Sequence, residues 1–342
     1  SLAGFAMATF GATKPKTAIK SLNKTTIQQP TYTEWHDLQV NAINRFPLHT
    51  NFFTYPADDW VSEKDGKIVS KDILHMNKAE SKYFLSLDGT WKFNWVANAD
   101  QRPTDFYKED LDDSKWKTMN VPGNWEMNGF GDPEYVNVGF GWRGHFDQQP
   151  PAVPTKDNHV GSYRRIIDIP ANWDGKQVVA HFGSVTSNIY LYVNGKFAGY
   201  AEDSKVAAEF DITPYLKKGK NLIAFQTFRW CDGSWDEDQD FWRLSGVARE
   251  SYLFARDAQL HLEDIRVTPD LVNNYKDGVL NISTKVKGNG KLNFILFDKE
   301  GKQVATATGL AKNGTANITM NVENPHKWSA ETPYLYTLQV SL

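Results

Sequence analysis

One stretch of the sequence gathers residues that could do chemistry. Residues 230–245 read WCDGSWDEDQDFWRLS and hold five acids and three tryptophans. Asp236, Asp238 and Asp240 fall two apart, which is the spacing of the first oxygen ligands in a calcium-binding EF-hand loop. Paired carboxylates can also serve glycoside hydrolysis, and aromatic rings beside them suit the edge of a sugar site. Three interpretations are therefore open: a metal loop, a sugar-binding edge, or a structural corner.

The neighbouring positions help to decide between these interpretations. Counted from Asp236, an EF-hand needs glycine at its sixth position and glutamate at its twelfth, where this sequence has Phe241 and Val247. A glycosidase needs two carboxylates held about 5 to 9 Å apart on rigid elements, which a run of acids does not establish. Asp and Glu also bond to backbone groups in tight corners. The sequence thus favours a structural corner with tryptophan rings packed beneath it.

Composition and charge argue against several classes of protein. The formal net charge of the 342 residues is −3, so no basic field predicts a nucleic acid or an anionic membrane as partner. No apolar run reaches the roughly 18 residues that a membrane span requires. The single cysteine, Cys231, excludes an intrachain disulfide and a zinc site built from several cysteines. Aromatic residues make up 13% of the chain, which favours a carbohydrate ligand and an aromatic sandwich core about equally.

The sequence also lacks the short motifs that mark other enzyme classes. It has no GxSxG nucleophile elbow, no HExxH zinc helix, no Walker loop and no GxGxxG that opens a helix. His145 and His159 do not stand at metal-binding spacing. The residues alone therefore leave a lectin and a fragment of an enzyme as open alternatives.

The order of patterns along the chain predicts a leader, an arm and a first β-domain. Residues 1–30 begin small and apolar and turn basic at Lys14 and Lys16, as at the end of a secretory signal peptide. This predicts a periplasmic or secreted protein, or a cytoplasmic one if these residues are foreign to it. Residues 31–82 show no clear periodicity and are predicted to form an extended arm. Residues 83–257 carry short runs of β-formers with turns between them, which predicts a jelly-roll sandwich.

Further patterns support an all-β chain with two sandwiches. Trp91, Phe93 and Trp95 alternate along SLDGTWKFNWV and predict a strand with one buried face. Asn194-Gly195 separates two β-forming runs and predicts a type I′ hairpin turn, because this pair tolerates positive φ. Residues 258–342 hold six or seven short strands with turn-like connections and predict an immunoglobulin-like sandwich.

Seven segments, in a fixed order along the chain, carry a resemblance to one family. They are EWHDLQVNAINRFPLH, SLDGTWKFNW, VPGNWEMNGFGDPEYVNV, PPAVPTKDNHVGSYRR, FGSVTSNIYLYVNGKFAGYAEDSKVAAEFDIT, RWCDGSWDEDQDFWRLSGVARE and VENPHKWSAETPYLYTL. Through them the chain resembles the N-terminal two domains, a jelly-roll sugar-binding domain and an immunoglobulin-like domain, of the lacZ-type β-galactosidases of glycoside hydrolase family 2. The alternative is a stand-alone carbohydrate-binding or adhesion module. A reading frame that continues past Leu342 into a barrel favours the enzyme.

The resemblance implies an enzyme whose bond-breaking residues lie elsewhere. The family places a catalytic TIM barrel after these two domains, with its acid/base Glu in an Asn-Glu pair, its nucleophile Glu and its magnesium ligands. No Asn-Glu pair occurs in the 342 residues. The resemblance thus implies that the parent protein hydrolyses terminal β-D-galactosides with retention, and that this span holds no catalytic residue and is inactive alone. Magnesium is expected only in the missing barrel.

The resemblance assigns roles to two residues of the first sandwich. Asn137, in YVNV, resembles an asparagine that hydrogen-bonds the galactosyl ring, and an amide can donate to and accept from hydroxyls. Asp203, in AEDSK, resembles an aspartate that contacts galactose and helps to hold a sodium ion. Glu202 stands beside it where the lacZ-type sequence has glutamine, which predicts an added negative charge next to the ion. Without the resemblance, both site residues are interpreted as ordinary turn residues.

The acidic stretch and the arm also match the family. Residues 230–245 resemble the corner where the jelly roll ends, with Trp235, Asp236 and Trp242 as expected lesser sugar contacts. Residues 35–49 resemble the segment through which the family's subunits contact each other, so homo-oligomers of the full enzyme are expected. The expected partner is a β-galactoside, whose identity and linkage the sequence leaves open.

Overall fold

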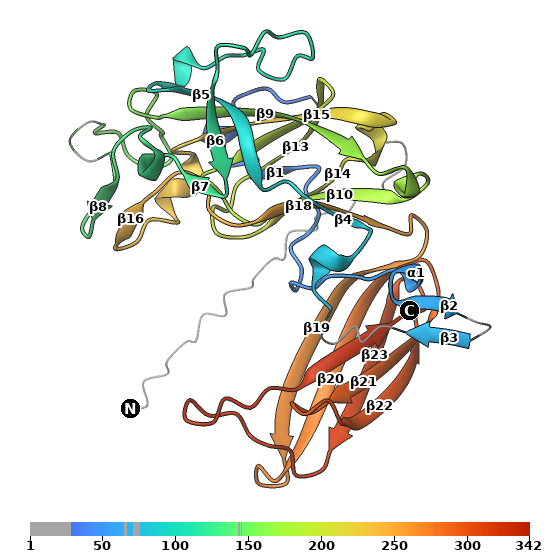
Figure 1. The fold of residues 1–342 in the computed structure, drawn as a ribbon. Coiled ribbons are helices and arrows are strands. Elements are labelled where there is room, and N and C mark those ends of the chain that lie inside the picture. The colour runs from blue at the N-terminus through green and yellow to red at the C-terminus, as the bar shows by residue number, and fades with distance from the viewer. Residues whose placement is uncertain (1–28, 65–66, 71–75, 143, 145) are drawn as a thin grey trace, which may run out of the picture.

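The fold is described by a computed structural model that covers residues 29–64, 67–70, 76–142, 144 and 146–342. Figure 1 shows two bodies of sheet, the first running from β4 (Phe84–Ser86) to β18 (Ser251–Arg256) and the second from β19 (His261–Val272) to β24 (Thr337–Ser341). The predicted all-β fold is confirmed. The leader predicted over residues 1–30 lies outside the described residues, apart from Gln29 and Pro30.

Helical segments in this part of the chain are only three or four residues long. They are η1 (Glu34–His36), α1 (Ala57–Trp60), η2 (Lys78–Glu80), η3 (Ala99–Gln101), η4 (Glu126–Asn128), η5 (Ala171–Trp173), η6 (Thr213–Tyr215) and η7 (Asp232–Trp235). Among the described residues, none of them has the length and apolar character that crossing a membrane requires.

Two antiparallel sheets make up the first sandwich. The larger has the order β1-β13-β12-β15-β9-β5-β6 and the smaller the order β14-β10-β18-β4. The strands of the larger sheet are β1 (Ala42–Ile43), β5 (Gly89–Val96), β6 (Lys117–Val121), β9 (Val160–Ile169), β12 (Ile189–Val193), β13 (Lys196–Ala201) and β15 (Gly219–Phe228). In the smaller sheet, β10 (Gln177–Phe182) and β14 (Ala208–Asp211) join β4 and β18.

Aromatic rings pack together with aliphatic side chains in the core between these sheets. Trp91 and Phe93 of β5 are buried on one face, as their alternation predicted. Phe182 of β10 meets Phe225 of β15 with ring centroids 5.3 Å apart, so the two sheets are in direct contact. Buried rings of this size contribute most of the apolar area that stabilises such a sandwich.

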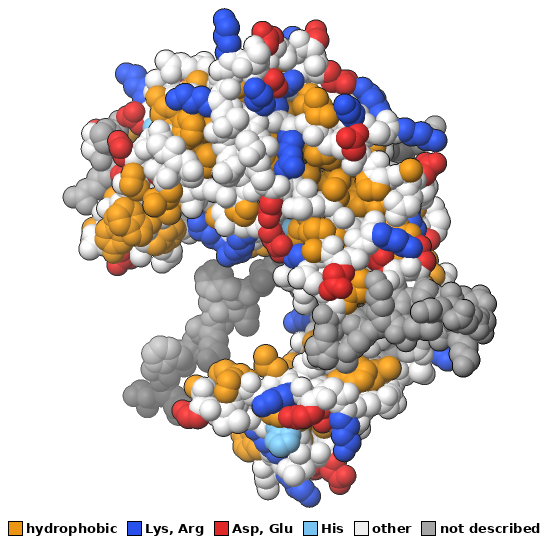
Figure 2. Space-filling view, viewed as in Figure 1, with side chains coloured by type: hydrophobic (Ala, Val, Ile, Leu, Met, Phe, Trp, Pro, Cys, Tyr) orange, Lys and Arg blue, Asp and Glu red, His pale blue; other side chains and the backbone are white. Residues whose placement is uncertain are grey.

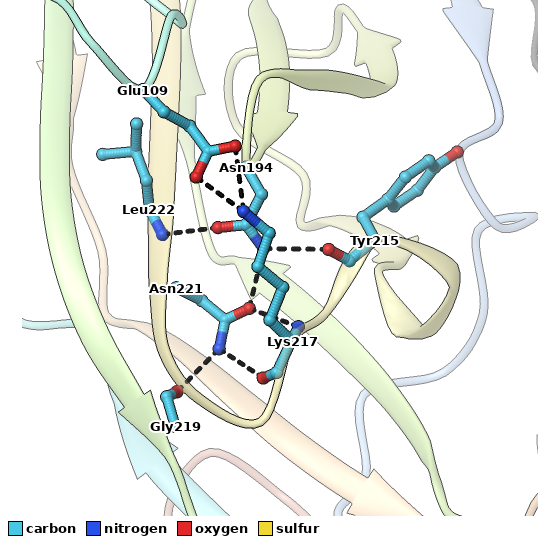
Figure 3. A network of polar contacts seen from close by, with 7 residues as sticks. All are labelled: Glu109, Asn194, Tyr215, Lys217, Gly219, Asn221 and Leu222. Atoms are coloured by element: carbon cyan, nitrogen blue, oxygen red, sulfur yellow. Dashed lines mark hydrogen bonds and ion pairs between the residues drawn. The ribbon is translucent and has the colours of Figure 1, made fainter.

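The hairpin between β12 and β13 turns at Asn194-Gly195, as predicted. Both residues have positive φ, 49° and 76°, as a type I′ turn requires. Figure 3 shows how the Asn194 side chain fixes this turn. Its Oδ1 accepts from the Leu222 N–H at 2.9 Å, and its Nδ2 donates to Asn221 Oδ1 at 2.7 Å and to the Tyr215 carbonyl at 2.9 Å.

Short ribbons lie at one end of the first sandwich, on the left of the upper body in Figure 1. The strand β8 (Glu134–Val136) pairs with β16 (Phe241–Arg243), and β17 (Gly246–Val247) pairs with both β11 (Val185–Thr186) and β7 (Gly123–Asn124). The acidic stretch of residues 230–245 leads from β15 into these ribbons, so it belongs to this end of the sandwich.

The arm packs on the first sandwich before it reaches the second. Trp35 is buried and stacks on Phe228 with ring centroids 5.0 Å apart. Strand β1 then pairs with β13, and Phe53 contacts Tyr252 of β18 at a centroid distance of 6.3 Å. The chain continues through α1 and a hairpin of β2 (Val61–Lys64) and β3 (Lys67–Ser70) before β4 begins.

The second body is a small sandwich of two three-stranded sheets, in the orders β19-β20-β23 and β22-β21-β24. Its other strands are β20 (Asp277–Lys287), β21 (Lys291–Phe297), β22 (Gln303–Leu310) and β23 (Thr315–Val322). Along β20, Leu280, Ile282, Thr284 and Val286 are buried, while Asn281, Ser283 and Lys285 between them are exposed. Together with Phe294 of β21, the apolar residues among the buried ones form one core, so the predicted immunoglobulin-like sandwich is confirmed.

Candidate functional site

Asp203 lies just beyond the end of β13. Its φ of 83° is left-handed, which is uncommon for a residue other than glycine. Arg45 Nη1 donates to Asp203 Oδ2 at 2.5 Å. The Asp203 side chain is 42% exposed, and its other oxygen, Oδ1, has no hydrogen-bond partner among the described residues. The carboxylate is therefore held through one oxygen and open at the other.

Asn137 directly follows β8, on the ribbon that β8 forms with β16. In this ribbon Val136 pairs with Phe241, and Tyr135 pairs with Trp242. The Asn137 side chain is exposed, and within the described part of the chain its amide makes no hydrogen bond. Tyr135 and Trp242 are 52% and 54% exposed and meet edge to face at 5.5 Å. Figure 2 shows hydrophobic side chains gathered at this end of the sandwich.

One small depression links the surroundings of these two site residues. Ser204, which follows Asp203, lines it, and so does Phe241, which pairs with the residue before Asn137. Its volume is about 40 Å³, whereas sites for small molecules usually measure about 300–1,000 Å³. The structure thus brings Asn137 and Asp203 to the same end of the sandwich, but the described residues do not enclose a sugar-sized pocket there.

The aspartates spaced like calcium ligands, Asp236, Asp238 and Asp240, do not share a common partner. Asp238 forms an ion pair with Arg243, and Asp240 accepts a hydrogen bond from the Tyr135 hydroxyl. Asp236 is exposed to solvent. These carboxylates do not converge on a common point, which argues against a calcium loop, and Asp238 and Asp240 are engaged within the corner itself.

The corner also supports the segment that carries Asp203. Glu237 Oε1 accepts a hydrogen bond from the Ser204 N–H at 3.0 Å. Trp235 donates from Nε1 to the Ala152 carbonyl at 2.9 Å and packs edge to face on Trp142 at 4.7 Å. Trp235 is therefore engaged in packing within the corner, whereas Trp242 is exposed.

A buried acid pair lies directly behind Asp203. Glu202, Cys231 and Asp232 place their side-chain ligand atoms within 4.8 Å of one another, and Tyr200 donates its hydroxyl to Glu202 Oε1 at 2.5 Å. Burial raises the pKa of Glu202 to about 8 and raises the pKa of Asp232 as well. The raised pKa favours the protonated form of Glu202 at neutral pH, which argues against the negative charge that the sequence predicted beside Asp203.

A second buried carboxylate anchors the arm near Arg45. Glu209 of β14 accepts hydrogen bonds at 2.8 Å from His181 Nδ1, on the neighbouring strand β10, and from His49 Nε2. Burial alone would raise the pKa of Glu209, but the bonds from His181 and His49 outweigh it and hold that pKa at about 2. The same bond to Glu209 raises the pKa of His49.

Sequence reasoning missed both Arg45 and this histidine pair. Arg45 lies 158 positions from Asp203, and His49 lies 160 positions from Glu209. The arm around them shows no periodicity that would orient a side chain. The one available signal was the polar character of Arg45 and His49 in NRFPLH, within a segment that resembles the family.

Two β-sandwiches, the first with an aromatic and acidic end, define the fold class of this chain. Residues 84–257 match the protein family described as "Glycosyl hydrolases family 2, sugar binding domain". Residues 260–342 match the family described as "Glycosyl hydrolases family 2". The chain therefore belongs to glycoside hydrolase family 2, as its sequence predicted.

Proteins similar in sequence to this chain are considerably longer than it is. It is 36% identical over 324 residues to a beta-galactosidase of Priestia megaterium, which covers 91% of this chain and 30% of that protein. It is 32% identical to the beta-galactosidase large subunit of Leuconostoc lactis, over 90% of this chain and 48% of that subunit. The chain thus spans about a third to a half of these relatives.

Solved structures share the fold. A Bifidobacterium dentium beta-glucuronidase superimposes with a TM-score of 0.59 at 19% identity, over 76% of this chain and 44% of that one. A family 2 member from Bacteroides cellulosilyticus gives a TM-score of 0.54 at 23% identity, over 75% of this chain and 34% of that one.

Proposed function

We propose that this chain is the N-terminal, substrate-shaping part of a β-galactosidase that hydrolyses terminal β-D-galactosides with retention of configuration. The observation that carries the proposal is the 36% identity to a beta-galactosidase through both sandwiches. A retaining glycosidase needs two carboxyl groups about 5–5.5 Å apart. In the proposal, the rest of the protein supplies that pair, and the first sandwich supplies groups that hold the sugar.

Asn137 and Asp203 are the groups proposed to hold the galactosyl ring. The exposed amide of Asn137 can donate to one hydroxyl and accept from another. The open oxygen of Asp203 can accept from a hydroxyl while Arg45 holds the other oxygen. Both side chains are at the surface of the same end of the sandwich, so a sugar bound between this end and the rest of the protein could reach both.

A sodium ion at Asp203 is part of the proposal. An open carboxylate oxygen is a hard ligand of the kind that such cations prefer. Arg45 is positively charged and 2.5 Å from the same carboxylate, which opposes a second cation there. The ion would therefore need further oxygen ligands from outside the described residues, and its role would be to orient the sugar.

The test is the activity of the full-length protein. We expect it to hydrolyse an aryl β-galactoside at least tenfold faster, in kcat/KM, than the matching aryl β-glucuronide. The glucuronide is the chosen comparison because structures of that specificity share this fold. A preference for the glucuronide, or no hydrolysis of either substrate by a folded full-length protein, would overturn the proposal.

The proposal extends to export and assembly. The signal-like composition of the first residues supports a periplasmic or secreted protein, which cell fractionation tests. The resemblance of residues 35–49 to a subunit-contacting segment supports homo-oligomers, which sedimentation of the full protein tests. In the structure, Trp35 and Ile43 of this segment are buried, so an oligomer contact would use its exposed residues, Leu38 and Leu48 among them.

A further inference from the structure

Arg45 belongs to the arm, yet its guanidinium contacts Asp203 on the first sandwich. The Arg45 side chain is 14% exposed, whereas Asp203 is 42% exposed. The contact therefore has a largely shielded member and a more accessible one. A partly buried guanidinium with a charged partner forms a stronger and more directional bond than a pair fully in water.

The arm backbone holds Arg45 in place from both sides. Just before it, Ala42 and Ile43 of β1 pair with the last two residues of β13. Arg45 itself forms a β-bridge with Phe210 of β14, and the Phe46 N–H donates to the Glu209 carbonyl at 2.9 Å. Arg45 thus stands where the arm crosses from the larger sheet to the smaller one, with little backbone freedom.

Asp203, in contrast, sits on a loop with a strained backbone. A left-handed φ in a residue other than glycine persists only where the surroundings enforce it. The loop is supported on one side by the arm, since the Glu202 N–H donates to the Asn41 carbonyl at 3.0 Å. On the other side the Glu237 carboxylate holds the Ser204 N–H. The remaining freedom is rotation of the Asp203 carboxylate, which Arg45 restrains.

We propose that Arg45 is a positioning residue for Asp203, and that the arm is thereby part of the sugar site. This inference rests on the proposed function. Arg45 binds Oδ2 and aims Oδ1 at a galactosyl hydroxyl, so the carboxylate meets the sugar already oriented. Pre-orientation of this kind strengthens binding because less rotational freedom is lost when the sugar arrives.

The experiment compares Arg45→Gln, Arg45→Lys, Asp203→Asn and the Arg45→Gln/Asp203→Asn double variant in the full-length protein. We expect Arg45→Gln to lower kcat/KM for an aryl β-galactoside by roughly 10- to 100-fold, the effect of losing a hydrogen bond to a charged group. Arg45→Lys should restore part of this loss, since it keeps the charge without the planar fork. In the Asp203→Asn background, Arg45→Gln should cost less than about twofold, because residues that act as a unit are not additive.

Two control variants separate positioning from a purely structural role. Lys217→Gln removes an exposed ion pair with Glu109 at the opposite end of β13 (Figure 3), and should leave kcat/KM unchanged. His49→Gln weakens arm docking without touching Asp203, and its loss of kcat/KM should stay additive with that of Asp203→Asn. Equal, additive losses from Arg45→Gln and His49→Gln would show that Arg45 only fastens the arm.

The outcomes separate failure of the inference from failure of the proposed function. A full-length protein that folds and does not hydrolyse β-galactosides overturns the proposed function. An active protein in which Arg45→Gln and Asp203→Asn multiply their effects overturns the inference alone. Non-additive losses with partial rescue by Arg45→Lys support it.

Discussion

His49 of the arm and Glu209 of β14 form an ion pair at 2.8 Å inside a cluster completed by His181. The pair joins segments 160 residues apart. The strength of this ion pair falls at both high and low pH, because His49 must be protonated and Glu209 must be ionised. Nearby charges on Arg256 and Asp264 act on the same pair.

The pH dependence of this anchor can be predicted in sign. The pKa of His49 is raised above 6.5 in the fold, so its contribution is fully present below 6.5 and is lost as pH rises through the folded value. Glu209 has its pKa lowered from 4.5 to about 2, so its contribution is present above 4.5 and is lost as pH falls toward 2. Both contributions are complete between 4.5 and 6.5.

His49→Gln tests the upper limit of that window. Solvent screens the pair in part, so we expect the substitution to lower the free energy of unfolding of the 342-residue chain by about 1 kcal/mol at pH 5.5. The loss should shrink as the pH rises through the raised pKa of His49, because the neutral ring no longer forms an ion pair. Chemical denaturation at pH 5.5 and at a series of higher pH values measures it, and a loss that does not change with pH would contradict the assigned charge.

Glu202→Gln should stabilise the chain in alkaline solution. The pKa of Glu202 is raised by burial to about 8, so the stability that its retained proton supports is present below 4.5 and is lost as pH rises toward 8. Glutamine stays neutral, can accept from Tyr200 and can donate to Asp232. We expect a gain of about 1–3 kcal/mol at pH 8.5 and almost none at pH 5, measured by denaturation. If Glu202→Gln lowered the free energy of unfolding at pH 8.5, the raised pKa assigned to Glu202 would be contradicted.

Gly161→Ala should destabilise the first sandwich. A Cβ on Gly161 of β9 would lie 2.4 Å from the Trp125 ring and 2.8 Å from the Phe93 ring, in a core with little room to shift. Overpacking of this kind costs about 1–3 kcal/mol. Gly309→Ala on β22 is the control, since its nearest neighbour, Ile318 Cγ2, would be 3.2 Å away. Similar melting temperatures for both variants would count against the packing described for β9.

Asp203→Asn and Asp240→Asn, made in the full-length protein, test which acids serve the sugar. Asp203→Asn keeps the shape but removes a charge-assisted hydrogen bond, so kcat/KM for an aryl β-galactoside should fall roughly 10- to 150-fold. Sodium activation should weaken in parallel. Asp240 bonds to Tyr135 in the structural corner, and its substitution should change kcat/KM less than about twofold. If Asp240→Asn abolished kcat/KM and the sodium response while Asp203→Asn left both unchanged, the roles assigned to the two aspartates would be reversed.

The 342-residue chain alone should fold and show no hydrolysis of an aryl β-galactoside. The acids of residues 230–245 are engaged in the corner, and no nucleophile with an adjacent base is visible among the described residues. Turnover that persists through a second purification to homogeneity would contradict this expectation.

Local patterns in the sequence predicted the features that short-range physics decides. Trp91 and Phe93 alternate because a strand exposes opposite faces in turn, and Asn194-Gly195 forms its turn because both residues tolerate positive φ. The two sandwiches followed from such signals. The family resemblance pointed to Asn137 and Asp203, which the residues alone would have left as turn positions.

The contacts around Asp203 could not be predicted in this way. The pairing of Arg45 with Asp203 depends on a strand of two residues, β1, which is too short to show a period. The raised pKa of Glu202 depends on its burial and on Asp232, which belongs to η7 in a later part of the chain. Such contacts arise only when distant segments dock, so no local window of sequence contains them.

The brevity of β1 has a consequence for how the chain behaves in a crowded solution. Strand β13 would be the outer strand of the larger sheet without β1, and its free N–H and C=O groups could recruit another copy of the chain. Ala42 and Ile43 of β1 pair with the last two residues of that strand, while β1 itself is too short to template a further strand. The arm therefore covers the end of this edge strand, and we expect truncation before Arg45 to increase self-association of the chain, which sedimentation measures.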